Sequence, residues 1–324
     1  SARRQLSSRP AHRNWSASTG RLLDVTSITQ QTPEPGAGRR HVGIILHPAR
    51  EEAVDVAVQF VQGMFDHGIA CLGLGERITD LRQRLPGIEI QQASNASLAE
   101  AELMVVFGGD GTILRAAELV VPLGVPLLGV NLGHVGFLAE LESHDVHKLV
   151  KQVSDRNYFV EERLTLTVDV ASHAGAPLWS SFAVNEVTLE KAAHEKMLDV
   201  LVEIDALPVS RWGCDGMLVS TPTGSTAYAF SLGGPIIWPD VQAFLLVPMA
   251  AHALFARPMV VAPDSLVDLT LSKRFTAHAT VWCDGRRSID ISPGARLQVR
   301  RGEHNLRVAR LQEQPFTSRL VKKF

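Results

Sequence analysis

The sequence predicts a protein in two parts, an α/β domain followed by an all-β domain. From about residue 41 to residue 145, buried-strand patterns alternate with helical patterns, which is typical of a parallel sheet covered by helices on both faces. After about residue 160 the helical periods give way to short strands separated by Gly, Pro, Asp and Asn, as in an all-β domain. A length of 324 residues is sufficient for two cores.

Residues 1–40 show no sustained apolar periodicity. They contain seven arginines, six serines and only two acids, a composition that cannot bury enough apolar surface to offset the entropy of ordering. We therefore expect a disordered tail at 1–40. An Arg- and Ser-rich, acid-poor segment is also typical of an organelle transit peptide, although the amphipathic pattern is poor here.

A Rossmann-like α/β domain is predicted at 41–145. Within it, residues 51–66 form an amphipathic helical pattern that ends at Gly68. The apolar positions of this pattern are Val54, Val58, Val61 and Phe65. The other elements expected in this domain are strands at 42–46, 69–74, 103–107 and 126–130 and a helix at 113–121.

A β-sandwich-like domain is predicted at 146–304. Residues 164–170 alternate strictly between apolar and polar side chains, the pattern of a half-buried strand. Less strict alternation predicts further strands at 184–189, 198–204, 266–271 and 297–299. Near the boundary, residues 144–153 are expected to form one connecting helix.

Composition and charge restrict the class of protein. The chain is 45% hydrophobic and 20% charged, with a formal net charge of −2, so nothing indicates a nucleic-acid partner. No apolar run approaches the ~20 residues of a membrane helix. The cysteines Cys71, Cys214 and Cys283 are odd in number and far apart, which favours free thiols in a reducing, cytoplasmic compartment. A Cys/Asp metal site is the weaker alternative, and we predict no metal ligands.

The loop FGGDGTIL at 107–114 joins a predicted strand to a predicted helix. Ligands gather at the carboxyl ends of parallel strands, and Gly108, Gly109 and Gly111 would let backbone N–H groups approach a phosphate closely beside the helix N-terminus. Thr112 is a capping candidate. Asp110 is ionised at neutral pH and can accept a hydroxyl proton while that oxygen attacks phosphorus. The loop therefore indicates kinase chemistry, and helix capping by Asp110 is the alternative.

A second segment, DGMLVSTPTGSTAYAFSLGGP at 215–235, concentrates hydroxyl side chains between glycines and prolines. Such a composition suits a ligand that has sugar hydroxyls and a flat base, although a structural loop could have the same composition. Together with GGDGT at 108–112, NLGHVGFL at 131–138 and NE at 185–186, this segment resembles the NAD kinase family from about residue 41 to residue 324. The sequence as a whole looks most like the actinobacterial branch of this family. GGDGT alone is also similar to diacylglycerol-type lipid kinases and, more loosely, to phosphofructokinases.

Members of this family transfer the γ-phosphoryl group of ATP, or in some cases of polyphosphate, to the adenosine-ribose 2′-hydroxyl of NAD. The resemblance implies that Asp110 is the proton acceptor, that Gly111 lies against NAD and that Arg115 faces phosphate charge. It also implies Mg²⁺ as the cofactor of ATP, assembly into a homodimer or homotetramer, and return of residues 305–324 to the first domain.

The resemblance further implies that Asn185 and Glu186 hold the adenine and ribose and that Asp215 faces the nicotinamide. The residues implied to line the adenosine pocket are Phe137, Thr223, Thr226, Ala227, Tyr228 and Ser231. Two positions depart from the family pattern. Gly213 replaces a common arginine, which suggests that NADH is accepted as well as NAD, and Ala206 replaces a glycine in a hairpin turn, where alanine disfavours positive φ.

Two other functions remain open from the sequence. A lipid kinase would need an apolar cavity, which the hydroxyl-rich residues 220–231 do not favour. A non-catalytic sensor that binds NAD would carry the same binding residues, and only the retention of Asp110 argues for turnover.

Overall fold

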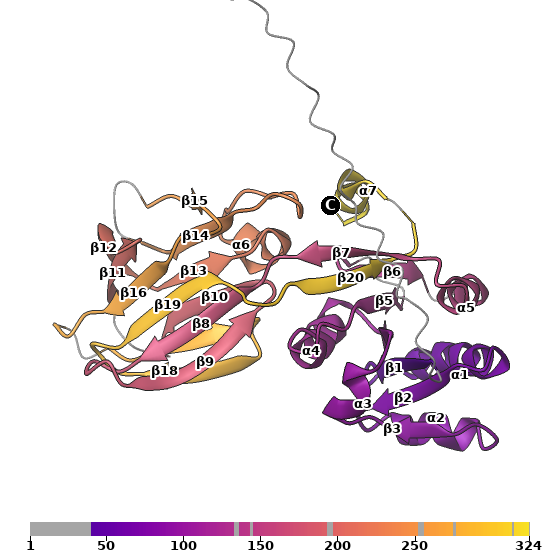
Figure 1. The fold of residues 1–324 in the computed structure, drawn as a ribbon. Helices are drawn as coiled ribbons and strands as arrows, with labels where there is room; N and C mark the ends of the chain where they lie inside the picture. The colour runs from indigo at the N-terminus through magenta and orange to yellow at the C-terminus, as the bar shows by residue number, and fades with distance from the viewer. Residues whose placement is uncertain are drawn as a thin grey trace, which may run out of the picture. The chain divides into compact units, whose positions relative to one another are not determined.

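The computed structural model describes residues 40–132, 136–142, 145–192, 197–251, 256–274, 277–312 and 314–323. It contains one mixed sheet flanked by helices and two antiparallel sheets, which confirms the predicted fold class (Figure 1). Residues 1–39 of the expected tail and residues 133–135 of the NLGHVGFL segment lie outside the described residues.

The mixed sheet has the strand order β3-β2-β1-β4-β5-β20-β7, with β6 beside β5. Only β7 runs antiparallel to its neighbour. Its strands are β1 (His41–Leu46), β2 (Ala70–Leu74), β3 (Ile90–Gln92), β4 (Leu103–Phe107), β5 (Leu127–Asn131), β6 (Ala139–Glu142), β7 (Phe159–Arg163) and β20 (Leu306–Arg310). The helices of this part are α1 (Glu51–Asp66), α2 (Ile78–Arg84), α3 (Asn95–Ala99), α4 (Asp110–Val120), α5 (Val146–Ser154) and α7 (Phe316–Lys323).

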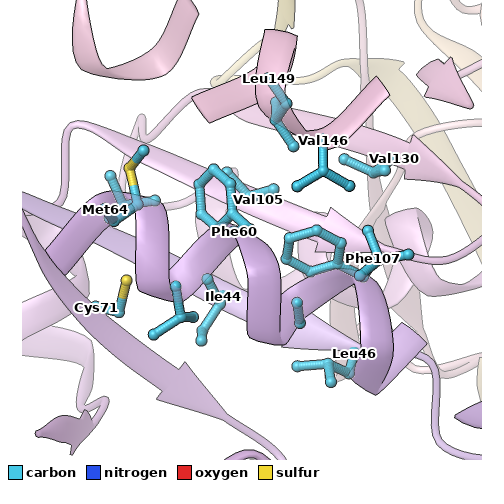
Figure 2. Packing of buried hydrophobic residues seen from close by; sticks show 14 of the residues in the cluster. Ile44, Leu46, Phe60, Met64, Cys71, Val105, Phe107, Val130, Val146 and Leu149 are labelled. Atoms are coloured by element: carbon cyan, nitrogen blue, oxygen red, sulfur yellow. The ribbon is translucent and has the colours of Figure 1, made fainter. Parts of the chain in front are cut away.

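Helices cover both faces of this sheet because successive strand residues point to opposite faces. Ile44 packs in the core of α1, α2 and α5, whereas Ile45 packs in the core of α3 and α4. In the first core Phe60 of α1 lies against Phe107 of β4, with ring centroids 5.5 Å apart (Figure 2). Phe65, which the helical pattern assigned to the apolar face, is 48% exposed. The buried face instead runs through Phe60.

The segment 146–163 lies with the α/β sheet, although the predicted division assigned it to the β domain. The apolar face of α5 joins the core of α1, and Gly63 permits this close packing because a Cβ atom there would lie 2.6 Å from Val150 Cγ2. Strand β7 pairs with β20, which brings the C-terminal part of the chain into this sheet.

The β domain consists of two six-stranded antiparallel sheets. One has the order β15-β14-β13-β10-β17-β18 and the other β12-β11-β16-β19-β8-β9. The strands are β8 (Leu166–Ala171), β9 (Pro177–Ala183), β10 (Glu186–Lys191), β11 (Leu198–Ile204), β12 (Leu207–Cys214), β13 (Gly216–Ser220), β14 (Phe244–Met249), β15 (Met259–Val261), β16 (Val267–Leu271), β17 (Ala279–Cys283), β18 (Arg287–Ile291) and β19 (Arg296–Arg301). The alternating residues of both sheets form one core. A smaller apolar cluster includes Ala229 of the short helix α6 (Tyr228–Ser231) and Leu218 of β13.

The three cysteines are free and buried. Cys71 belongs to the α/β core, and Cys214 and Cys283 belong to the β core. Burial raises the pKa of each thiol to about 12. Each cysteine therefore packs as a small hydrophobic residue. Among the described helices, none is long and apolar enough to cross a membrane.

The hairpin between β11 and β12 contains the unusual Ala206. Asp205 and Ala206 have φ angles of 54° and 64°, the pair of positive values that a two-residue type I′ turn requires. The Asp205 carboxylate accepts hydrogen bonds from Ser265 Oγ at 3.0 Å and Leu266 N at 2.9 Å. The turn is therefore held from outside the hairpin, and alanine is retained in a conformation that favours glycine.

Replacement of Ala206 by glycine is expected to stabilise the protein. The substitution removes the Cβ contact that disfavours the left-handed region, and we expect the free energy of unfolding to rise by about 1 kcal/mol. Chemical denaturation would measure this change. Ala176→Gly is the control, because Ala176 is exposed and has no positive φ, and glycine there should be neutral or destabilising. Equal effects of the two substitutions would contradict the explanation.

Candidate functional site

Asp110 lies where the order of the parallel strands reverses. From β1 the chain continues outward to β2 and β3, while β4 and β5 lie on the other side of β1, so the ends of β1 and β4 form a topological switch point. After β4, Gly109 is the N-cap of α4 and Asp110 is its first residue. A Cβ atom at Gly109 or at Gly111 would meet no atom within 4 Å. The backbone on both sides of Asp110 is therefore accessible to a ligand.

Two backbone amides hold the Asp110 carboxylate. Phe137 N donates to Oδ2 at 3.1 Å and Leu138 N donates to Oδ1 at 3.2 Å. The preceding residue, Gly136, makes this approach possible, because a Cβ atom there would stand 2.4 Å from Asp110 Oδ1. The carboxylate also lies at a helix N-terminus, where negative charge is favoured. These contacts fix the orientation of the carboxylate.

The other predicted residues of this segment have different environments. Gly108 packs tightly on Thr112, since a Cβ atom there would be 2.5 Å from Thr112 Oγ1. Thr112 itself is buried. Arg115 is exposed one turn further along α4, and Phe137 is half-buried. Thus Gly108 and Thr112 shape the loop, and Gly109, Gly111 and Asp110 form its accessible part.

Glu186, of the predicted pair Asn185 and Glu186, is a buried carboxyl group. It begins β10, is only 8% exposed, and its Oε2 atom has no hydrogen-bond partner. Burial and the nearby Asp284 raise the pKa of Glu186 to about 8, although the backbone N–H of Tyr228 acts in the opposite direction. A buried acceptor without a partner is costly, and a ligand with hydroxyl donors would satisfy it.

The hydroxyl-rich segment packs directly on Asn185. The Asn185 carbonyl accepts hydrogen bonds from Thr221 N at 2.9 Å and Ser220 Oγ at 3.1 Å. Gly224 is required here, because a Cβ atom at this position would lie 2.1 Å from Asn185 O. The remaining predicted residues follow in the 3₁₀ turn and in α6. Thr223 is buried, Thr226 and Ala227 are half-buried, and Tyr228 and Ser231 are exposed.

Asp284 was missed by the sequence analysis. Asp284 and Gly285 form a turn, with φ angles of 52° and 62°. In addition, Asp284 Oδ1 accepts hydrogen bonds from Asn185 N at 2.7 Å and Val184 N at 3.1 Å. Burial raises the pKa of Asp284, while these donors and Arg287 oppose the shift. The buried carboxylate therefore fixes the backbone that presents Asn185 and Glu186.

Helix α4 connects the two parts of the site. Its residue Glu118 accepts a hydrogen bond from Arg286 Nε at 2.8 Å and lies 3.3 Å from Arg287 Nε. Arg287 also donates to Asp284 Oδ2 at 3.1 Å. Val184, which precedes Asn185, is buried in the same apolar cluster as the inner face of α4. The helix that begins with Asp110 thus contacts the residues that hold Asn185 and Glu186.

Asp215 lies apart from these residues. Strands β10 and β13 pair so that Glu186 is opposite Ser220 and Glu190 is opposite Gly216. Asp215 precedes Gly216 and is therefore at the other end of the strand from Glu186, five residues or about 17 Å along it at roughly 3.3 Å per residue. It forms an ion pair of 2.7 Å with Lys191. The described residues contain no group of three or more His, Cys, Asp and Glu that could hold a metal ion.

Known proteins resemble this chain over most of its length. Residues 42–158 match the model of the ATP-NAD kinase N-terminal domain, and residues 184–311 match that of the ATP-NAD kinase C-terminal domain. The chain is 55% identical to the NAD kinase of Cutibacterium acnes over 285 residues, which cover 88% of this chain and 89% of the relative. It is 48% identical to the NAD kinase of Thermobifida fusca, with coverage of 88% and 89%.

Two solved structures share the fold. The yeast NADH kinase complexed with NADH has a TM-score of 0.76 at 20% identity and covers 88% of this chain and 86% of its own. An NAD kinase from Archaeoglobus fulgidus in complex with ATP has a TM-score of 0.65 at 24% identity, with coverage of 87% and 98%. The fold, the glycine-rich loop and the curated relatives together define a kinase, an enzyme that transfers phosphoryl groups. The chain belongs to the NAD kinase family.

The raised pKa of Glu186 predicts a specific dependence of stability on pH. The folded protein holds this proton up to about pH 8, whereas an unfolded glutamate releases it near pH 4.3. Between these values the folded state binds more protons, so the contribution of Glu186 to stability falls as pH rises and is lost above pH 8. Glu186→Gln should therefore stabilise the ligand-free protein relative to wild type, with a difference that grows between pH 5 and pH 8.

Thermal unfolding of wild type and Glu186→Gln from pH 5 to pH 9 would measure this difference. Glu162→Gln is a matched control, since Glu162 is exposed in β7. A difference between wild type and Glu186→Gln that does not vary with pH would show that Glu186 titrates normally.

Proposed function

We propose that the protein is an NAD kinase that transfers the γ-phosphoryl group of ATP to the adenosine-ribose 2′-hydroxyl of NAD, giving NADP and ADP. The observation that carries this proposal is the Asp110 carboxylate, oriented by the amides of Phe137 and Leu138 beside an open glycine backbone. The curated relatives, which are named NAD kinases, support the same reaction.

In this reaction the 2′-oxygen attacks the γ-phosphorus, and the bond from that phosphorus to the β,γ-bridging oxygen breaks. The hydroxyl proton passes to a carboxylate oxygen of Asp110, and the electron pair of the broken bond leaves with ADP. The two amides only donate hydrogen bonds to the carboxylate, and the proton acceptor is Asp110 itself. Their role is therefore to fix the orientation of the Asp110 carboxylate. Phosphoryl transfer depends mostly on such positioning and on electrostatic stabilisation.

For NAD we propose the contacts that the family resemblance implies. The diol hydroxyls of the adenosine ribose would satisfy the buried Glu186 Oε2, and hydrogen bonds from them would favour the ionised carboxylate. Asn185 would bind the adenine edge and Asp215 the nicotinamide side, which agrees with the separation of Asp215 from Glu186 along an extended ligand. Lining of the adenosine pocket is proposed for Phe137, Thr223, Thr226, Ala227, Tyr228 and Ser231.

For ATP we propose that the accessible backbone of Gly109 and Gly111, at the N-terminus of α4, binds phosphate oxygens. Gly108 and Thr112 would shape this loop, and Arg115 would contribute charge. The triphosphate of ATP itself supplies oxygen ligands for a divalent cation. Mg²⁺ would then be held through phosphate oxygens and water and would neutralise triphosphate charge. From the family resemblance, polyphosphate is proposed as an alternative phosphoryl donor.

We also propose an assembly and a location. Strand β12 lies at the edge of its sheet and exposes Leu207 and Val209, and a homodimer or homotetramer would cover this apolar surface. Three free thiols agree with a reducing, cytoplasmic compartment.

Substitution of Asp110 by asparagine tests the function and the mechanism together. Asparagine keeps the size and removes the proton acceptor, so NADP formation from Mg-ATP and NAD should fall in kcat by about a hundredfold or more. Asp66→Asn is the control, since Asp66 is exposed at the end of α1. Equal rates for wild type and Asp110→Asn would refute the mechanism. NAD binding by wild type without NADP formation would support a sensor.

A further inference from the structure

A buried cluster of charge lies beside the Asp110 contacts and has no role in the reaction described above. Its cations are Arg163, Arg310 and Arg319, all at most 8% exposed. Glu161 forms ion pairs of 2.5 Å with Arg163 and 3.1 Å with Arg310. Burial acts to raise the pKa of Glu161, but Arg310 and Arg163 hold it below the ordinary value. Burying several cations around one glutamate is expensive, so the contacts of these arginines need a physical explanation.

Two of these arginines bind the backbone that holds Asp110. Arg319 Nη1 donates to the Phe137 carbonyl at 3.0 Å, and Arg310 Nη1 donates to the Leu138 carbonyl at 3.1 Å. The Phe137 carbonyl and the Leu138 N–H belong to the same peptide group, and that N–H donates to Asp110 Oδ1 at 3.2 Å. A continuous chain of hydrogen bonds therefore runs from the Arg319 guanidinium through one peptide to Asp110.

This chain of hydrogen bonds has two physical effects. A planar peptide bound at both ends cannot rotate without breaking a hydrogen bond, so its N–H direction is fixed. A cation on the carbonyl oxygen also polarises the peptide, which strengthens the bond that the N–H donates. Both effects act on the orientation of the carboxylate.

Helix α7 places Arg319 for this contact. Phe316 precedes Arg319 by three residues and so lies on the same side of the helix. Its ring contacts Phe137, with centroids 6.1 Å apart, and Trp238, with centroids 5.3 Å apart. Phe137 is thus bound by α7 through its ring and through its carbonyl. Helix α7 therefore makes two separate contacts with Phe137.

We propose that Arg319 is a positioning residue for phosphoryl transfer, which orients Asp110 through the peptide between Phe137 and Leu138. The inference rests on the proposed NAD kinase function. It assigns a role in the reaction to the C-terminal helix, which lies 182 positions after the residue that it holds.

The test compares wild type with Arg319→Met, Arg319→Lys and Lys322→Met. Methionine keeps an apolar stem of similar length in the buried site but cannot donate to the Phe137 carbonyl, whereas lysine restores one donor. Lys322 is exposed on the same helix. Lys322→Met therefore removes the same charge without changing the contact with the Phe137 carbonyl. In NADP formation, Arg319→Met should lower kcat by about tenfold to a hundredfold. KM for NAD and ATP should stay within about twofold of wild type, because no substrate contact is removed.

Arg319→Lys should recover part of the lost kcat, and Lys322→Met should match wild type. Hydrogen–deuterium exchange gives a readout that does not depend on activity. The peptide containing residues 136–142 should exchange faster in Arg319→Met than in wild type and should be unchanged in Lys322→Met, because the Leu138 amide loses the constraint on its peptide.

The outcomes separate the inference from the proposed function. If wild type forms NADP and Arg319→Met keeps both the wild-type kcat and the wild-type exchange, the positioning role is wrong while the NAD kinase function stands. If wild type forms no NADP, the proposed function fails, and exchange at 136–142 still decides whether Arg319 holds this peptide. If Arg319→Met does not fold, Arg319→Lys decides: reduced kcat with faster exchange supports the inference, and wild-type values for both overturn it.

Discussion

The orientation of one carboxylate by two backbone amides is the constraint on which the rest of the site depends. The proposed role of Asp110 requires a directed carboxylate, and the amides of Phe137 and Leu138 direct one oxygen each. The fold meets this requirement with β4, which delivers Asp110 to the strand ends, and with Gly136, which has no side chain to separate the two segments. Glycine at this position is therefore a steric requirement and not only a flexible residue.

The second constraint is the position of this carboxylate relative to the residues proposed to hold the dinucleotide. Helix α4 carries Asp110 at its start and Glu118 two turns later, and Glu118 contacts the arginines beside Asp284. Asp284 in turn fixes the backbone of Asn185. Helix α4 and the buried Asp284 carboxylate thus fix the position of Asp110 relative to Asn185. This arrangement is what a reaction that depends on positioning requires.

Much of the fold could be predicted from local patterns. Alternating apolar residues revealed the class of each domain, and the glycines around Asp110 indicated a ligand-binding turn. Long-range packing decided the rest. Phe65 fits the helical pattern but is exposed, because the sheet meets the face of α1 that contains Phe60. Helices α2 and α3 and strand β3 were not predicted, since they are short and carry few apolar residues. Asp284 acts on an amide 99 positions earlier in the chain, and no local spacing indicates such a contact.

The reactivity of the buried cysteines also depends on whether the core around each of them opens. A thiol with a pKa of about 12 has almost no thiolate at neutral pH, and a reagent must also reach it. Alkylation therefore requires the surrounding core to open first. Because Cys71 lies in one core and Cys214 and Cys283 lie in the other, labelling rates at individual cysteines distinguish local opening of either layer from cooperative unfolding of the whole chain.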